Sequence, residues 1–126
     1  MNNCSCSIEA SEGEPCSFLN IKYIRARKKH NCCECKKIIQ PKEQYERLSG
    51  CWEGGFGTYK TCMDCVSIRK AFFCTFVFES LYEYLREEIR ETDGDLSQDC
   101  IAMLTPKAKE KVLKMIDEYI VEMKGE

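Results

Sequence analysis

Two Cys-x-x-Cys pairs constrain the fold of this chain of 126 residues more than any other feature. Cys32 and Cys35 form the first pair, and Cys62 and Cys65 form the second, after an insert of 26 residues. Each pair can present two thiolates from one tight turn, and four thiolates at about 2.3 Å suit a tetrahedral zinc ion. We therefore expect these four cysteines to hold one structural zinc ion. A closed site of this kind offers no coordination position to a substrate, so the pattern predicts a role in folding and not in catalysis.

Two neighbouring residues leave the ligand set open. Cys33 forms a Cys-x-Cys pair with Cys35, and His30 lies two residues before Cys32. Either residue could replace a ligand of the first pair. Cys-x-x-Cys is the commoner spacing, so we keep Cys32 with Cys35 and assign His30 to a basic surface.

Seven of the eleven cysteines lie outside these pairs, at positions 4, 6, 16, 33, 51, 74 and 100. Free cysteine is often a small buried hydrophobic residue, which suits Cys74 and Cys100 in their apolar surroundings. Cys4 and Cys6 instead have polar Asn and Ser neighbours. A second metal site made of Cys4, Cys6 and two of Cys16, Cys74 and Cys100 is therefore a further hypothesis. It would raise the expected zinc content from one ion to two and tie the N-terminal segment to the helical tail.

The first residues and the longest apolar run indicate the expected compartment. Residues 1–6 lack the basic start and the apolar stretch of a signal peptide, and the apolar run over residues 71–78 is too short to span a bilayer. We expect a cytoplasmic protein without membrane contact. Its odd cysteine count and its paired motifs then favour reduced thiols over a disulfide framework.

Periodicity and turn residues predict an α+β fold in three parts. Residues 1–27 are expected to be an irregular cysteine-containing segment whose end, a basic stretch, leads into the first pair as a short strand. Residues 28–75 are expected to form the metal module. Residues 76–126 carry apolar residues at helical spacing among many acidic ones, which predicts an acidic amphipathic helical hairpin packed on that module.

Within the metal module, the first pair is followed by two segments typical of strands. Tyr45–Ser49 and Thr58–Thr61 alternate as half-buried strands do, and four glycines between them predict a long hairpin tip. A helix is expected to begin at the second pair. In the tail, Thr105 and Pro106 are suited to the N-cap and first position of the last helix.

A metal-binding turn, a β-hairpin and a helix that carries the second ligand pair together resemble the treble-clef zinc finger. The resemblance covers about residues 28–73 and is carried by Cys32-Cys33-Glu34-Cys35 with the turn that runs on to Tyr45. The whole chain also resembles small zinc-binding proteins encoded by bacteriophages and prophages, which have a similar finger and an acidic tail with a Leu-Thr-Pro helix start, here at residues 104–106. This resemblance implies a viral protein in the host cytoplasm and does not by itself imply an activity.

The net charge of −2 conceals a division of the chain. Residues 22–70 hold twelve Lys and Arg against five Asp and Glu, a balance of +7. Residues 71–126 hold seven against thirteen, a balance of −6. Such asymmetry indicates a charged partner. The predicted contact surface comprises a basic cluster and two aromatic residues at the hairpin tip: Arg25, Arg27, Lys28, Lys29, Lys36, Lys37, Trp52 and Phe56.

These features favour a non-enzymatic protein, because no acid–base set, phosphate loop or histidine pair for a metal nuclease is present. Our first hypothesis is a zinc-stabilised protein that binds or inhibits a host protein, such as a defence or nucleic-acid-processing complex. The alternative is a nucleic-acid-binding zinc finger or regulator that uses the basic face of residues 22–47. The helical tail could also form a homodimer through its apolar stripe.

Overall fold

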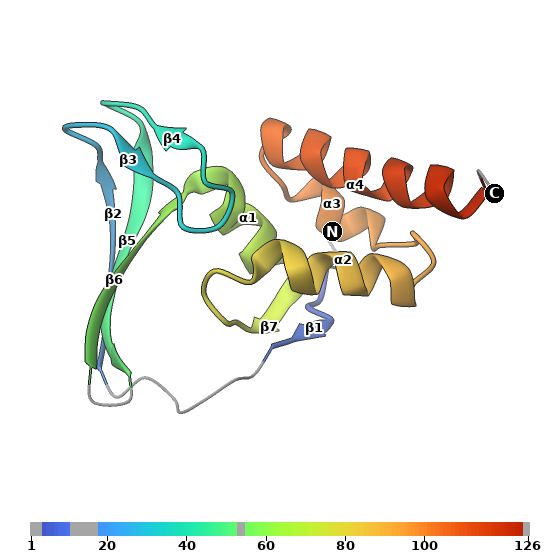
Figure 1. The fold of residues 1–126 in the computed structure, drawn as a ribbon, viewed down its shortest axis with the longest axis horizontal. Helices are drawn as coiled ribbons and strands as arrows, with labels where there is room; N and C mark the ends of the chain where they lie inside the picture. The colour runs from blue at the N-terminus through green and yellow to red at the C-terminus, as the bar shows by residue number, and fades with distance from the viewer. Residues whose placement is uncertain (1–3, 11–17, 53–54, 125–126) are drawn as a thin grey trace.

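A computed structural model describes residues 4–10, 18–52 and 55–124, and we describe no other part of the chain. The side chains of residues 18, 19 and 52 are also outside the description, so the predicted contact at Trp52 and the predicted ligand Cys16 are not placed. The fold is mixed α+β. A three-stranded sheet lies at one end of the molecule (Figure 1). Helices α2 (Leu81–Glu91), α3 (Gln98–Ala102) and α4 (Pro106–Lys124) lie at the other end, and α1 (Met63–Phe72) lies between them.

The main sheet is antiparallel with strand order β2-β5-β6, formed by β2 (Phe18–Arg25), β5 (Gln44–Trp52) and β6 (Gly55–Cys62). Strand β2 lies within the segment 1–27, of which the sequence predicts the basic end as a short strand and the rest as an irregular chain. The structure corrects the prediction of an irregular chain at residues 18–21, because β2 pairs with β5 along its whole length. This pairing joins residues far apart in the sequence, so local periodicity did not show it. The division of the chain into three parts is otherwise still a prediction.

The β5–β6 hairpin is longer than predicted. The pairing continues to Trp52 and Gly55, where the sequence suggested a long glycine-rich tip. Gly50 and Gly57 are paired with each other inside the ladder. Glycine there weakens a strand but does not end it. Gly50, Gly55 and Gly57, which the sequence assigned to the tip, therefore lie within the strands.

Two small sheets complete the β structure. Strand β3 (His30–Asn31) pairs antiparallel with β4 (Ile38–Ile39) on either side of the first cysteine pair. Strand β1 (Ile8–Glu9) pairs in parallel with β7 (Phe73–Thr75), which directly follows α1. The N-terminal segment is thereby held against the end of the first helix.

Helix α1 (Met63–Phe72) begins at the second cysteine pair, as predicted, and is followed by α2 (Leu81–Glu91), α3 (Gln98–Ala102) and α4 (Pro106–Lys124). The Thr105 hydroxyl accepts a hydrogen bond from the amide of Ala108, which confirms the predicted N-cap of α4. Helix α2 starts later than the apolar pattern suggested. The preceding loop contains Glu79 with a positive φ of 72° and places the Phe78 ring on that of Tyr59.

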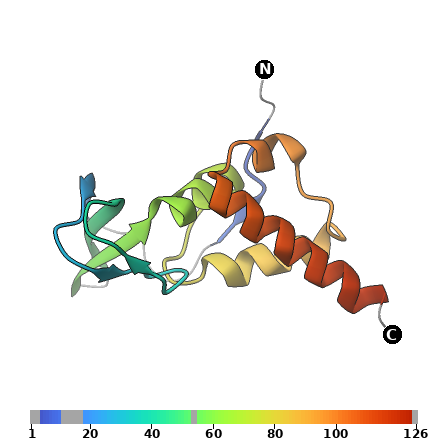
Figure 2. The ribbon, with the colours of Figure 1, turned by 90° about the horizontal axis from the view of Figure 1, so that it is seen from above.

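One hydrophobic core joins the metal module to the helices. Its fully buried side chains include Ile39 near the first cysteine pair, Phe72 on α1, Leu85 on α2 and Val112 on α4. Figure 2 shows α4 crossing over α2 with its C-terminal end pointing away from the sheet. No described helix combines the length and the apolar character needed to cross a membrane.

A buried ion pair holds α1 to the inner face of the main sheet. Glu46 on β5 is 0% exposed, and both of its carboxylate oxygens accept hydrogen bonds from Arg69 on α1, at 2.7 and 2.5 Å. The hydroxyl of Tyr23 donates a third hydrogen bond to the same carboxylate at 3.0 Å. This bidentate geometry offsets the desolvation of both charges, whereas removal of one partner would leave a buried charge uncompensated.

Arg69→Met should therefore lower the free energy of unfolding by about 3–5 kcal/mol, because it leaves the Glu46 carboxylate buried without its counter-charge. The measurement is urea unfolding of the metal-loaded protein. Arg47→Met is the matched control. It makes the same change on the next residue of β5, whose side chain is exposed, and should alter stability by no more than about 0.5 kcal/mol. Equal losses in the two variants would contradict the role of this ion pair.

Candidate metal centre

The four cysteines of the two Cys-x-x-Cys pairs meet at one point between β3, β4, β6 and α1. Their sulfur atoms all lie within 4.8 Å of one another. The Sγ atoms of Cys32 and Cys65 are 3.8 Å apart, as are those of Cys35 and Cys62. A tetrahedron with Zn–S bonds of about 2.3 Å has sulfur–sulfur edges of about 3.8 Å. The cluster can hold a metal ion, and its size and donor set fit zinc.

Backbone hydrogen bonds fix the first pair as a tight turn. The amide of Lys36 donates to the carbonyl of Cys32 at 3.0 Å, and Lys36 has a positive φ of 66°. The amides of Glu34 and Cys62 both donate to the sulfur of Cys32 at 3.4 Å. Such N–H groups stabilise a thiolate. The turn is also fastened to the sheet, since the amide of Cys33 donates to the carbonyl of Lys60 at 2.9 Å.

The two open alternatives for the ligand set lie outside the cluster. Cys33 places its sulfur 3.4 Å from the hydroxyl of Thr61, and burial raises the pKa of its thiol to about 12, so it stays protonated. His30 places Nδ1 3.2 Å from Nζ of Lys60. Its pKa is lowered by burial and by the charges of Lys60 and Lys28, so the ring is a neutral part of the basic surface. Among the described residues, the metal-sized group contains only the four predicted cysteines.

Proton sharing within the cluster favours metal binding. The pKa of Cys32 is lowered by side-chain hydrogen bonds with Cys35, Cys62 and Cys65, of which that with Cys35 contributes most. The pKa of Cys65 is raised, mainly by its hydrogen bonds with Cys32, Cys35 and Cys62 and then by burial. One thiolate thus forms at the expense of its neighbours. A zinc ion would displace the remaining protons and compensate the four negative charges with two positive ones.

Two carboxylates near the ligands connect the centre to the helices, and sequence reasoning missed both. Glu34, inside the first pair, accepts hydrogen bonds from the amides of Glu79 and Leu81 at 2.8 and 3.1 Å, where α2 begins. Asp64 lies between the two cysteines of the second pair. Its carboxylate accepts a hydrogen bond of 2.6 Å from the hydroxyl of Thr105, at the start of α4. Their signal in the sequence is only their position inside a Cys-x-x-Cys pair.

Asp64 also binds one residue of the predicted contact surface. Its carboxylate is 2.8 Å from Nζ of Lys37, which is half-buried. Burial raises the pKa of Asp64, but the hydrogen bonds from Lys37 and Thr105 outweigh it and hold the pKa below its ordinary value. Lys37 therefore acts beside the metal centre, where its charge offsets the thiolates.

The other predicted surface residues with described side chains are exposed, and most lie along one edge of the molecule. Arg27, Lys28 and Lys29 form the loop after β2, and the guanidinium of Arg25 donates to the carbonyl of Lys42 across the neighbouring turn. Lys36 is exposed beside the first cysteine pair. Phe56 is 69% exposed near the hairpin tip, at the opposite end of the sheet. Their role in binding is still a prediction.

The hypothesis of a second metal site is corrected by the structure. Cys4 is bonded to Cys100, and Cys6 is bonded to Cys74, as two disulfides. A disulfide sulfur is not a thiolate and does not serve as a zinc ligand. The expectation of reduced thiols fails at the same four positions. The pairs span 96 and 68 residues, and connectivity over such distances cannot be deduced from spacing. The predicted tie between the N-terminal segment and the tail exists, but as a covalent bond.

Searches of protein-family models, of curated proteins and of solved structures return no match to this chain. The resemblance to phage-encoded proteins thus gains no support from a relative. The candidate site is defined by its own geometry.

Replacement of any one ligand cysteine by Ser should abolish retention of the metal ion, because three sulfurs leave the tetrahedral site open. The measurement is the metal content per chain after gel filtration, which we expect to be one ion for the unaltered protein. Cys33→Ser is the matched control, since Cys33 is adjacent to Cys32 but outside the cluster, and it should retain the ion. Loss of metal in Cys33→Ser with retention in Cys32→Ser would contradict the assigned ligand set.

Proposed function

We propose that this protein is a non-enzymatic, zinc-stabilised nucleic-acid-binding protein of the treble-clef type. The observation that carries the proposal is a row of three cations across the main sheet. The strand register pairs Lys22 with Arg47 and Arg47 with Lys60. Directly paired residues of neighbouring strands point to the same face, so the three charges lie side by side.

This row lies on the face of the sheet turned away from α1. Glu46, the residue before Arg47 on β5, points to the opposite face, where Arg69 binds it. Like charges in direct register destabilise a sheet. In the described register, no Asp or Glu is paired on the same face as the cation row. Negative charge from a ligand would relieve this repulsion, and phosphates along a strand supply it in a regular series.

The surroundings of the row also suit a nucleic acid. The neighbouring pairs place Asn20, Ser49 and Thr58 on the same face, which adds hydrogen-bonding groups. Phe56 lies on this face near the hairpin tip and is largely exposed, so its ring can stack on a base. The loop with Arg27, Lys28 and Lys29 extends the positive charge at the other end of the sheet. A positively charged groove or face with an aromatic stacking group favours a single strand.

The metal centre supports this surface by fixing the sheet. Cys62 ends β6, and Lys60 lies two residues before it, hydrogen-bonded through its carbonyl to the first cysteine pair. Zinc contributes the charge and geometry that hold these segments together. The four thiolates would reduce the balance of +7 in residues 22–70 only by about two units once the ion is counted. The binding face would remain positive.

A protein partner, the first hypothesis from the sequence, remains the competing proposal. It would use the acidic helical part, whose helix α4 exposes Leu113, Val121 and Met123. The same residues would serve the proposed homodimer. No described feature of α4 selects one occupant, whereas the cation row selects a polyanion. We therefore place nucleic acid first.

Arg47→Glu should weaken binding of a single-stranded oligonucleotide at least about tenfold, because Arg47 is the centre of the row and reversal repels phosphate. Fluorescence anisotropy at several salt concentrations gives the affinity and its salt dependence. Each lost phosphate contact should reduce the slope of log affinity against log salt by about 0.7. Lys124→Glu, the same reversal at the distant end of α4, is the matched control and should bind normally.

Phe56→Ala tests the contribution of base stacking to binding separately from the contribution of charge. It should weaken binding of a single strand by about 1–3 kcal/mol and leave the salt slope unchanged. Oligonucleotide binding that is absent in the metal-loaded protein, or equal in Arg47→Glu and the unaltered chain, would contradict the proposal. Co-purification of a protein that tolerates Arg47→Glu would then favour the competing one.

A further inference from the structure

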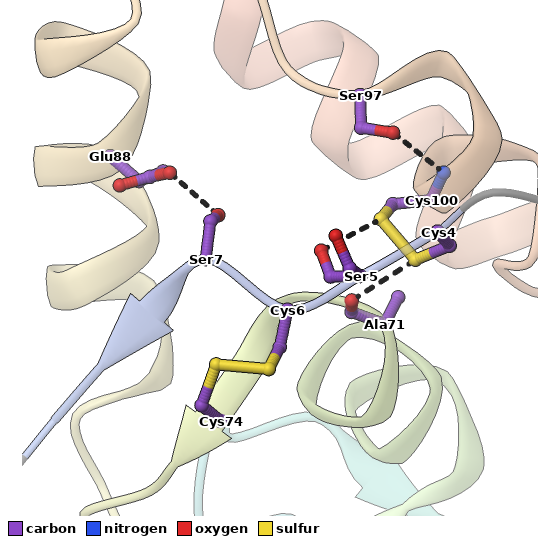
Figure 3. The surroundings of a disulfide bond; sticks show 9 residues. All are labelled: Cys4, Ser5, Cys6, Ser7, Ala71, Cys74, Glu88, Ser97 and Cys100. Atoms are coloured by element: carbon purple, nitrogen blue, oxygen red, sulfur yellow. Dashed lines mark hydrogen bonds between the residues drawn. A yellow bond between two sulfur atoms is a disulfide. The ribbon is translucent and has the colours of Figure 1, made fainter.

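The segment Cys4–Ala10 is fastened to the helical part of the molecule by two disulfides, and Figure 3 shows both. Cys4 is bonded to Cys100 on α3, and Cys6 is bonded to Cys74 on β7. The two bonds leave the same short segment toward different elements. We call this segment, residues 4–10, the N-terminal latch.

Weaker contacts continue the attachment beyond the disulfides. The amide of Ser7 donates to the carbonyl of Phe72 at 3.0 Å, and the amide of Ala10 donates to the carbonyl of Thr75 at 3.3 Å. The Ser7 hydroxyl donates to the Glu88 carboxylate on α2 at 2.7 Å. Ile8 and Ala10 are 5% and 2% exposed. The latch therefore covers apolar surface and, in the described residues, provides the strand that pairs with β7.

The two disulfides differ in their access to solvent. Cys6 and Cys74 are both exposed. Cys100 is 1% exposed, and Cys4 is partly buried with its sulfur 3.2 Å from the carbonyl oxygen of Ala71. Thiol–disulfide exchange requires that a thiolate reach a sulfur atom along the bond axis. The bond Cys6–Cys74, which we call the outer bond, is formed by two exposed residues, whereas the inner bond, Cys4–Cys100, is shielded by the burial of Cys100.

We propose that Cys6–Cys74 is a redox site on which small thiols act, and that its reduction opens the latch while Cys4–Cys100 keeps it tethered. The thiolate of one reductant molecule attacks one sulfur of the outer bond, forming a mixed disulfide and releasing the other cysteine as a thiol. The thiolate of a second reductant molecule attacks the mixed disulfide. Two reductant thiols are oxidised to one disulfide, and Cys6 and Cys74 each gain a proton and become thiols.

The consequence of this reaction is local. Without the outer bond, β1 remains on β7 through the backbone hydrogen bonds, the hydrogen bonds from Ser7 to Glu88 and from Thr75 to Ala10, and the burial of Ile8 and Ala10. A two-residue strand pair is marginal by itself. Its opening would free the edge of β7 and the apolar surface beneath the latch. The metal centre takes no part, because its four cysteines form a separate cluster.

The test uses the full-length, metal-loaded protein, first equilibrated in oxidised glutathione and then transferred to reduced glutathione. Free thiols are alkylated at intervals and located by peptide mass spectrometry. We expect Cys6 and Cys74 to be labelled at least about tenfold faster than Cys4 and Cys100, with the metal content unchanged. Simultaneous labelling of all four cysteines, earlier labelling of Cys4 and Cys100, or failure of the outer bond to form in oxidised glutathione would overturn the proposal.

Paired variants test the opening itself by hydrogen exchange. The double variant Cys6→Ser with Cys74→Ser should exchange the amides of Ser7 and Ala10 at least about tenfold faster than the oxidised protein, and glutathione should have no further effect on them. The double variant Cys4→Ser with Cys100→Ser is the matched control and should still respond to glutathione. Unchanged exchange rates for the amides of Ser7 and Ala10 in the first variant would overturn the proposal that the outer bond keeps the latch closed.

Discussion

The cluster of Cys32, Cys35, Cys62 and Cys65, which can hold one metal ion, is the constraint on which the rest of this structure depends. It joins the turn at Cys32 and Cys35 to the end of β6 and the start of α1. Glu34 and Asp64, each inside a ligand pair, then hold the beginnings of α2 and α4. Zinc contributes about 10–16 kcal/mol in small zinc-finger peptides, which is comparable to the whole stability of a domain of this size. An ion bound by this cluster would position the helices as well as the turn that holds it.

The main sheet separates charge between its two faces. On the inner face, Glu46 neutralises Arg69 within the core. On the outer face, Lys22, Arg47 and Lys60 lie in register with no carboxylate paired beside them in the described strands. Because the one acidic residue of the described sheet points to the inner face, the outer face carries only positive charge. The separation follows from the period of two along β5, where residues 46 and 47 point to opposite sides.

The sequence predicted those features that depend on local pattern. The ligands follow from Cys-x-x-Cys spacing, and the start of α4 follows from Thr105 and Pro106. Features that depend on distant pairing were missed. Strand β2 needs β5 as its partner, the cation row needs the register of three strands, and the bond between Cys4 and Cys100 joins residues 96 apart. Their physical causes exist only once the chain has folded.

Hydrogen exchange of the protein with and without its metal tests the central claim most directly. We predict that chelation removes the protection of β6 and α1 and of the amides of Glu79 and Leu81, which bind Glu34 at the start of α2. Return of one equivalent of zinc should restore it. Equal protection of these amides in the metal-loaded and metal-free protein would contradict the account.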